Sequence, residues 1–329
     1  MDGASEAARG GARPGGPLRS RRVLAGLGAG SAALALACSP GGGGDPGHDA
    51  AAEVRVVATV VPLALLASPL ASSRVAVEVL VPPGATPHGY EPRPSDVARL
   101  AAADLFLRVG GSLDAWAARL LDAAGREPAS FVLLDVPDLG LRGLHGAPLR
   151  PTEEPDPHVW LDPVRVRDRV LPVLARRVAA VEPEGPAAVA GRLEAFRREL
   201  TSLDGEIRGL LEGIPTRAFV SFHPTWGYFA ERYGLRELEA LEKAPGRPPS
   251  PAELARLAEL ARSEGVRAVL LEPQLDPKLG RALAREIGVA TVVADPLGDP
   301  RDPERSTYAG LMRFNARAFH RALGGASPP

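Results

Sequence analysis

The chain has 329 residues, of which 45% are hydrophobic, so it is long enough to bury the cores of two compact lobes. Its 39 Lys and Arg residues nearly balance its 40 Asp and Glu residues, which gives a formal net charge of −1. Because no net basic field would attract a polyanion, this composition argues against nucleic acid as a partner.

The first 38 residues have the pattern of an export signal. Arginines precede an apolar run from Val23 to Ala37, which ends in small residues. This run is short for a membrane span. We therefore predict an extracytoplasmic protein, in the periplasm or on the outer face of the cytoplasmic membrane. The residues around Arg21 and Arg22 also resemble a twin-arginine export signal.

Cys38 is the only cysteine, so the chain has no internal disulfide. Its place after the apolar run fits a lipid-modified N-terminus, whereas Ala35 and Ala37 fit ordinary signal cleavage. The sequence leaves both a lipid-anchored and a soluble product open. Residues 39–53 contain the consecutive glycines Gly41 to Gly44 and are predicted to form a flexible tether.

From Val54 onward, short β-branched runs alternate with helical patterns, which is typical of α/β lobes with parallel sheets flanked by helices. A first lobe is predicted over residues 54–182, with strands at 54–61, 75–81, 105–109 and 131–136. A second lobe is predicted over residues 215–326, with strands at 217–222, 268–271 and 290–294 and helices at 251–264, 277–287 and 306–323.

Between the lobes, apolar residues recur at steps of three and four from Val189 to Ile214. This stripe predicts one long helix over residues 183–214 that joins the two lobes. Coiled-coil dimerisation is the alternative, but the stripe is single and short, so we expect a monomer.

Three of the six histidines, His88, His158 and His223, lie next to prolines in turn-like contexts. His88, His223 and Asp295 follow predicted strands, and ligands of open α/β sheets gather at the carboxyl ends of the strands. Three neutral imidazoles and one carboxylate would fill a tetrahedral zinc shell. Spacing alone leaves each histidine open between ligand and loop residue, and Asp295 open between ligand and turn residue.

Four motifs surround these residues in order. They are Pro87-His88-Gly89-Tyr90-Glu91-Pro92, Asp156-Pro157-His158-Val159-Trp160, Phe222-His223-Pro224-Thr225-Trp226-Gly227 and Asp295-Pro296-Leu297-Gly298. Together they resemble the ligand regions of the zinc and manganese substrate-binding proteins of ABC transporters. The resemblance runs in order from about Val54 to Leu323.

The resemblance implies two α/β lobes joined by one long helix, with a metal site in the cleft between them formed by His88, His158, His223 and Asp295. It also implies a protein without enzymatic activity, which captures a divalent metal ion and delivers it to the membrane permease of an ABC transporter. Relatives that carry manganese commonly have a carboxylate at the position of His223. Since zinc accepts nitrogen ligands readily, we expect Zn²⁺, with Mn²⁺ or iron as the alternative.

Two other functions use the same side chains. A zinc hydrolase needs an open coordination position and a general base, and no H-E-x-x-H motif occurs in the chain. A structural or adhesive lipoprotein could instead use the ion only to stabilise its fold.

Three carboxylates lie near the histidines in sequence and are expected to orient the imidazole rings: Glu91, Asp156 and Asp162. Asp162 precedes Pro163 and is expected to cap a helix rather than bind the ion. Residues 139–156 replace the histidine-rich loop of many zinc-binding relatives and contain only His145, which we expect to be an ordinary surface residue.

Overall fold

A computed structural model of the chain describes residues 53–125, 127–243 and 246–325, which belong to one compact unit. The predicted signal segment, Cys38 and the tether up to residue 52 lie outside these ranges. Within the described part, no helix is long and apolar enough to cross a bilayer.

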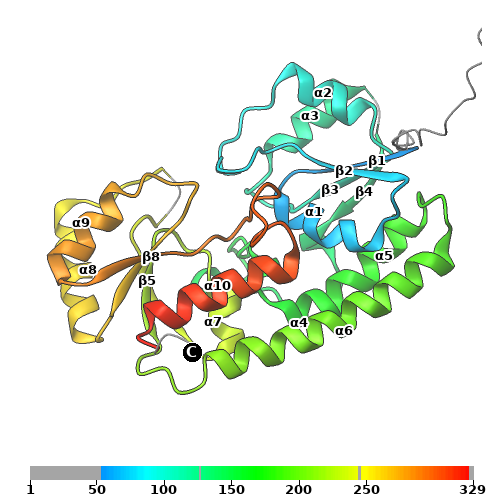
Figure 1. Ribbon diagram of the computed structural model, residues 1–329. Helices are drawn as coiled ribbons and strands as arrows, with labels where there is room; N and C mark the ends of the chain where they lie inside the picture. Colours follow the sequence, from blue (N-terminus) through cyan, green and yellow to red (C-terminus); the bar gives the residue numbers. More distant parts are fainter. Residues whose placement is uncertain (1–52, 126, 244–245, 326–329) are drawn as a thin grey trace, which may run out of the picture. The chain divides into compact units, whose positions relative to one another are not determined.

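The first lobe contains a four-stranded parallel sheet in the order β2-β1-β3-β4. Its strands are β1 (Val54–Ala58), β2 (Val75–Val79), β3 (Leu105–Arg108) and β4 (Ala129–Val132). Helices α2 (Pro94–Ala101) and α3 (Trp116–Ala124) cover one face, and α1 (Val61–Ala67) and α5 (Leu171–Ala179) cover the other (Figure 1). Alternate strand residues pack on opposite faces, with Phe106 in the cluster of Trp116 and Leu107 in the cluster of α1. The sheet is thus buried on both faces, as parallel sheets usually are.

The second lobe repeats this arrangement with the strand order β6-β5-β7-β8. Its strands are β5 (Ala218–Ser221), β6 (Arg236–Ala240), β7 (Ala268–Leu271) and β8 (Ala290–Val293). Helices α8 (Pro251–Ser263) and α9 (Lys278–Ile287) lie on one face, and α7 (Gly227–Tyr233) and α10 (Tyr308–Ala322) on the other (Figure 1). The predicted fold class, two α/β lobes with parallel sheets, is confirmed.

The predicted strands match the observed ones closely, with two differences. The strand expected at 131–136 begins at Ala129 and ends at Val132, where a 3₁₀ turn over Leu133–Asp135 follows. Edge strand β6 was not predicted, because the charged residues of Arg236–Ala240 conceal its alternation. The limits proposed for the lobes and the linking segment stay predictions.

Helix α6 (Pro186–Leu210) occupies the segment predicted to join the lobes. It contacts α5 of the first lobe and α10 of the second. Its buried residues, such as Phe196 and Leu203, belong to one apolar cluster that also includes Leu107 of β3 and Phe219 of β5. Because the two sheets share this cluster, the lobes cannot separate without exposing apolar surface to water.

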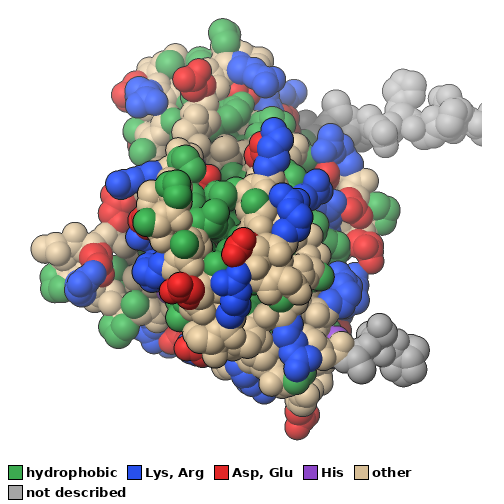
Figure 2. Space-filling model, turned by 90° about the vertical axis from the view of Figure 1, so that its left-hand side faces the viewer, with side chains coloured by type: hydrophobic (Ala, Val, Ile, Leu, Met, Phe, Trp, Pro, Cys, Tyr) green, Lys and Arg blue, Asp and Glu red, His purple; other side chains and the backbone are tan. Residues whose placement is uncertain are grey.

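Both charge signs occur on the surface. Figure 2 shows the face formed by the left-hand side of Figure 1, where basic and acidic side chains lie among hydrophobic ones. This mixture agrees with the nearly balanced charge of the sequence.

The loop before the second predicted ligand packs on the second lobe. His145 Nδ1 lies 2.9 Å from Oε2 of Glu237, whose side chain is fully buried on β6. A Cβ atom at Gly227 would lie 2.5 Å from the backbone nitrogen of Gly146, so only glycine allows this approach to α7. His145 is exposed, as expected of a surface loop, but its ring is also paired with a buried carboxylate, which the sequence did not predict.

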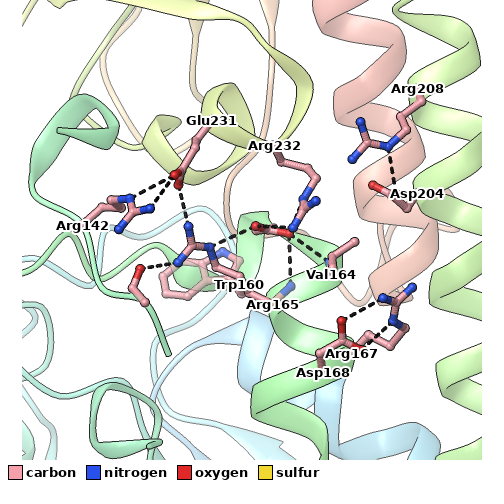
Figure 3. Close-up of polar contacts among 12 residues, drawn as sticks. Arg142, Trp160, Val164, Arg165, Arg167, Asp168, Asp204, Arg208, Glu231 and Arg232 are labelled. Carbon is pink, nitrogen blue, oxygen red and sulfur yellow. Dashed lines mark hydrogen bonds and ion pairs between the residues drawn. The ribbon is translucent and has the colours of Figure 1, made fainter. Parts of the chain in front are cut away.

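Ion pairs join the segment after His158 to helix α7 (Figure 3). Asp162 caps α4 (Pro163–Arg165), as predicted, by accepting hydrogen bonds from the backbone nitrogens of Val164 and Arg165. The same buried carboxylate pairs with Arg165 at 3.0 Å and with Arg232 of α7 at 2.9 Å. Arg165 also reaches Glu231 of α7 at 2.5 Å.

Arg142 approaches Glu231 from the loop side at 2.8 Å, so two arginines converge on this carboxylate (Figure 3). The backbone nitrogen of Arg142 donates to the hydroxyl of Tyr228, which in turn donates to the carbonyl of Asp156. Helix α7 therefore holds the chain on both sides of His158.

We expect Asp162→Ala to lower the free energy of unfolding by about 3 kcal/mol or more, because it removes a helix cap and leaves Arg232 without its carboxylate. Asp168→Ala is the matched control, since Asp168 pairs with Arg167 at a more exposed position. It should cost at most about 1 kcal/mol. Chemical denaturation of both variants measures the difference, and equal losses would contradict a structural role for Asp162.

The His145–Glu237 pair predicts a pH-dependent contribution to stability. Burial is the largest single effect and lowers the pKa of His145, but the hydrogen bond and charge of Glu237, together with the charges of Asp156 and Glu239, outweigh it and raise the pKa. A raised pKa in the folded state stabilises the fold at low pH, and this effect disappears as the pH rises through the folded-state pKa. His145→Gln should therefore destabilise the protein more at about pH 6 than at about pH 9. Thermal unfolding with His320→Gln as control tests this, and a loss independent of pH would contradict it.

Candidate metal centre

The three predicted histidines converge although they are far apart in sequence. His88 lies in the loop after β2, His158 directly before the 3₁₀ turn Val159–Leu161, and His223 two residues after β5. One ring nitrogen from each lies within 4.8 Å of the others. Their ring centroids are 5.4 to 5.9 Å apart. Loops from both lobes therefore bring three imidazoles to one point.

His158 is oriented by Asp156 and by its own turn. Its Nδ1 lies 2.7 Å from Asp156 Oδ1, which also accepts from the backbone nitrogen of His158. The neighbouring Trp160 donates from Nε1 to the carbonyl of Pro296, and its carbonyl accepts from the hydroxyl of Tyr308. Contacts to the second lobe thus hold the turn that carries His158.

His223 is oriented by a carboxylate of its own lobe. Its Nδ1 lies 2.8 Å from Oε1 of Glu272, a buried residue directly after β7. Its Nε2 lies 2.5 Å from the hydroxyl of Thr225, which is also 3.4 Å from Nε2 of His158. The two Nε2 atoms thus share one side, whereas each Nδ1 atom faces a carboxylate.

This pairing selects the tautomer. A carboxylate accepts a hydrogen bond from the protonated Nδ1, so the lone pair lies on Nε2, the nitrogen that can bind a metal ion. His88 supplies a third candidate, since its Nε2 is buried and has no hydrogen-bond partner. Metal-binding histidines typically have such carboxylate partners.

Of the three expected partner carboxylates, only Asp156 contacts a histidine of the cluster. Asp162 caps α4, and among the described residues no hydrogen bond joins Glu91 to the three rings. Glu272 was missed as a partner because its contact with His223 spans 49 positions. The signal available was its place after a predicted strand, in Glu272-Pro273-Gln274.

The three histidines differ in their affinity for protons. Burial lowers the pKa of His88 to about 3, and the neighbouring rings act in the same direction. Burial also lowers the pKa of His158 well below its usual value. For His223, burial is the largest single effect and lowers the pKa, but the charge and hydrogen bond of Glu272, together with the charges of Glu237 and Asp156, outweigh it and raise the pKa. At neutral pH two of the rings are therefore neutral, and proton competition falls mainly on His223.

Asp295 is engaged elsewhere in the structure. It is 1% exposed, and its Oδ1 accepts from Gln274 Nε2 at 2.8 Å and from the backbone nitrogens of Leu297 and Gly298. Its Oδ2 pairs with Arg305 at 2.7 Å. The cluster of mutually close ligand atoms does not include it. Asp295 as the fourth ligand therefore stays a prediction.

The three rings line a cavity of about 20 Å³, together with Glu272 and Gln274. This volume suits an ion with one small ligand. A larger cavity of about 400 Å³ adjoins it, shares Thr86 and His88, and is bordered by Glu242 and Asp276. His88 therefore lies between the small cavity and the outer one.

Known proteins share this fold and sequence. The family model described as "Zinc-uptake complex component A periplasmic" matches residues 56–322. The high-affinity zinc uptake system protein ZnuA of Bacillus subtilis is 26% identical over 82% of this chain and 88% of its own length. The protein of the same name from Paracoccus denitrificans is 28% identical over 75% of this chain and 85% of its own length.

Solved structures agree with these sequence matches. A crystal structure of ZnuA superposes with a TM-score of 0.73 at 27% identity, covering 82% of this chain and 99% of the other. A zinc-bound ZnuA deletion mutant has a TM-score of 0.72 at 28% identity, covering 84% and 99%. Since the family model spans both lobes and all three histidines, the chain belongs to the family of periplasmic A components of zinc-uptake complexes.

Proposed function

We propose that this protein captures Zn²⁺ outside the cytoplasm and delivers it to the membrane permease of an ABC transporter for import. The observation that carries the proposal is the convergence of His88, His158 and His223 in one small cavity. Membership in a periplasmic zinc-uptake family supports the same function.

The donor set favours zinc over manganese. Three imidazole nitrogens suit zinc, whereas manganese prefers oxygen ligands. Asp156 and Glu272 each pair one carboxylate oxygen with an Nδ1 atom, so the Nε2 atoms remain the metal-facing donors of His158 and His223. The zinc names of the relatives support this choice.

Binding rather than catalysis fits the family, whose members are transport components, so we assign no enzymatic activity. A location outside the cytoplasm follows from the same membership. Export by the twin-arginine route, a lipid on Cys38 and a monomeric state are further proposals that rest on the sequence.

Capture would use the ordered cluster with little rearrangement. Two rings are held by carboxylates, and the turn of His158 is anchored to the second lobe. An ion that binds this arrangement better than any other would stabilise it by differential affinity. Since ligands come from both lobes, the bound ion would tie them together.

His158→Gln should weaken zinc binding by more than about 100-fold, because loss of a ligand should exceed the roughly 10- to 100-fold effect of losing a partner of a ligand. The matched control is His320→Gln on α10, outside the cluster. Native mass spectrometry with zinc and manganese in competition reports stoichiometry and preference. A preference for manganese would contradict the metal assignment. If cells that produce His158→Gln grow normally under zinc starvation, the ion serves the fold and not import.

Zinc affinity should fall as the pH is lowered. The raised pKa of His223 makes its proton the main competitor of zinc, whereas His88, with a pKa of about 3, stays neutral across the physiological range. One competing proton lowers the affinity about tenfold per pH unit below its pKa. Titration with a competing chelator between about pH 8 and about pH 5 measures this, and a flat profile would contradict the three-histidine site.

A further inference from the structure

The side-chain amide of Gln274 lies beside the histidine cluster, with a hydrogen-bond partner for its nitrogen but none for its oxygen. It lines the small cavity with His88, His158 and His223. Its Nε2 donates to Oδ1 of Asp295 at 2.8 Å, while its Oε1 is buried and has no hydrogen-bond partner. Because an ionised carboxylate only accepts hydrogen bonds, the NH₂ end must face Asp295. The carbonyl is therefore the end that remains for a ligand in the cavity.

Several donors fix the carboxylate of Asp295 as a hydrogen-bond acceptor. Arg305 donates to its Oδ2 at 2.7 Å and is itself held by Asp302 and by the ring of Phe314, 5.1 Å from the guanidinium carbon. The amide of Asn315 brackets the backbone of Asp295, accepting from its nitrogen and donating to its carbonyl, both at 2.7 Å. For Asp295 to bind a metal ion through Oδ2, Arg305 would have to move away from a buried carboxylate, which is costly.

We propose that Gln274 is a positioning residue for zinc: its Oε1 accepts a hydrogen bond from the water molecule that fills the fourth position on the ion. Asp295 then orients Gln274 instead of binding the metal. This inference rests on the proposed function, because it assumes an ion held by His88, His158 and His223.

The chemistry favours a water between Gln274 and zinc. Zinc in proteins is bound by nitrogen, sulfur or carboxylate oxygen, and a neutral amide oxygen is not among its usual ligands. A zinc-bound water is acidic and therefore a strong donor, which a buried carbonyl without a partner suits well. The cavity of about 20 Å³ has room for one such small ligand beside the ion.

The test compares Gln274→Met with Asp295→Asn in the full chain. Methionine has nearly the length of glutamine but lacks its amide, whereas asparagine at 295 can still accept from Gln274 through Oδ1. Zinc affinity is measured by chelator competition, and Co²⁺ replaces zinc to report the ligand set by visible absorption. Arg301→Gln is the matched control, since Arg301 lies exposed in the same loop as Arg305 and pairs with Asp299.

Gln274→Met should lower zinc affinity by about 10- to 100-fold and change the Co²⁺ spectrum, because the water is no longer held. Asp295→Asn should lower the affinity less and leave the Co²⁺ absorption maximum in place. The reverse ranking, with the spectrum altered only by Asp295→Asn, would overturn the inference and make Asp295 the fourth ligand.

Folding is controlled by thermal unfolding of each metal-free variant. If Gln274→Met does not fold, Gln274→Ala tests the same loss of the carbonyl. A wild-type chain that binds neither zinc nor cobalt would overturn the proposed function and this inference together. A Gln274 variant that binds zinc as tightly as wild type would overturn this inference alone.

Discussion

One apolar cluster runs through both lobes and determines where the metal-binding loops can lie. It contains the inward residues of both sheets, such as Leu107 and Phe219, and the buried stripe of α6. Burial of each large apolar side chain contributes about 1.5 to 3 kcal/mol, so prying the lobes apart would cost many times the energy of a single loop contact. Because both sheets pack against this common core, the loops that follow the carboxyl ends of β2 and β5 lie close to each other at the histidine cluster. The convergence of His88 and His223 is therefore a consequence of how the core is packed.

The cluster also explains how ionisable groups can be buried at the site. Asp156 and Glu272 are buried, where an unpaired charge is costly. Each faces an imidazole Nδ1, and burial raises the pKa of Asp156 to about 7. The arrangement leaves the metal-facing nitrogens without acidic neighbours at hydrogen-bond distance. A cation would thus find imidazole nitrogens in front and carboxylates behind, an arrangement that orients the rings and raises their basicity as ligands.

Local sequence patterns encode much of the fold and of the candidate site. The strands of both sheets, the cap at Asp162 and the three histidines all have signals within a few residues, such as β-branched runs or a proline in the first turn. Strand β6 was not predicted, because Glu237 and Glu239 give its sequence the polar character of a surface segment, although Glu237 is buried against His145. The pairing of Glu272 with His223 and that of Arg305 with Asp295 were not predicted either. Pairs of this kind depend on which loops the core brings together, and one sequence alone does not contain that information.

The structure constrains how an ion can reach the histidines. A wide hinge motion would expose the common core and break the pairs of Asp162 with Arg232 and of Glu231 with Arg165. His158 and His223 are both buried and held by carboxylates, whereas His88 is only partly buried and adjoins the outer cavity. Its loop includes Gly84 and Gly89, whose positive φ angles of 85° and 78° suit residues without a side chain. Among the three histidines, His88 is therefore the one next to the outer cavity, whereas separation of the lobes would expose the apolar core that they share.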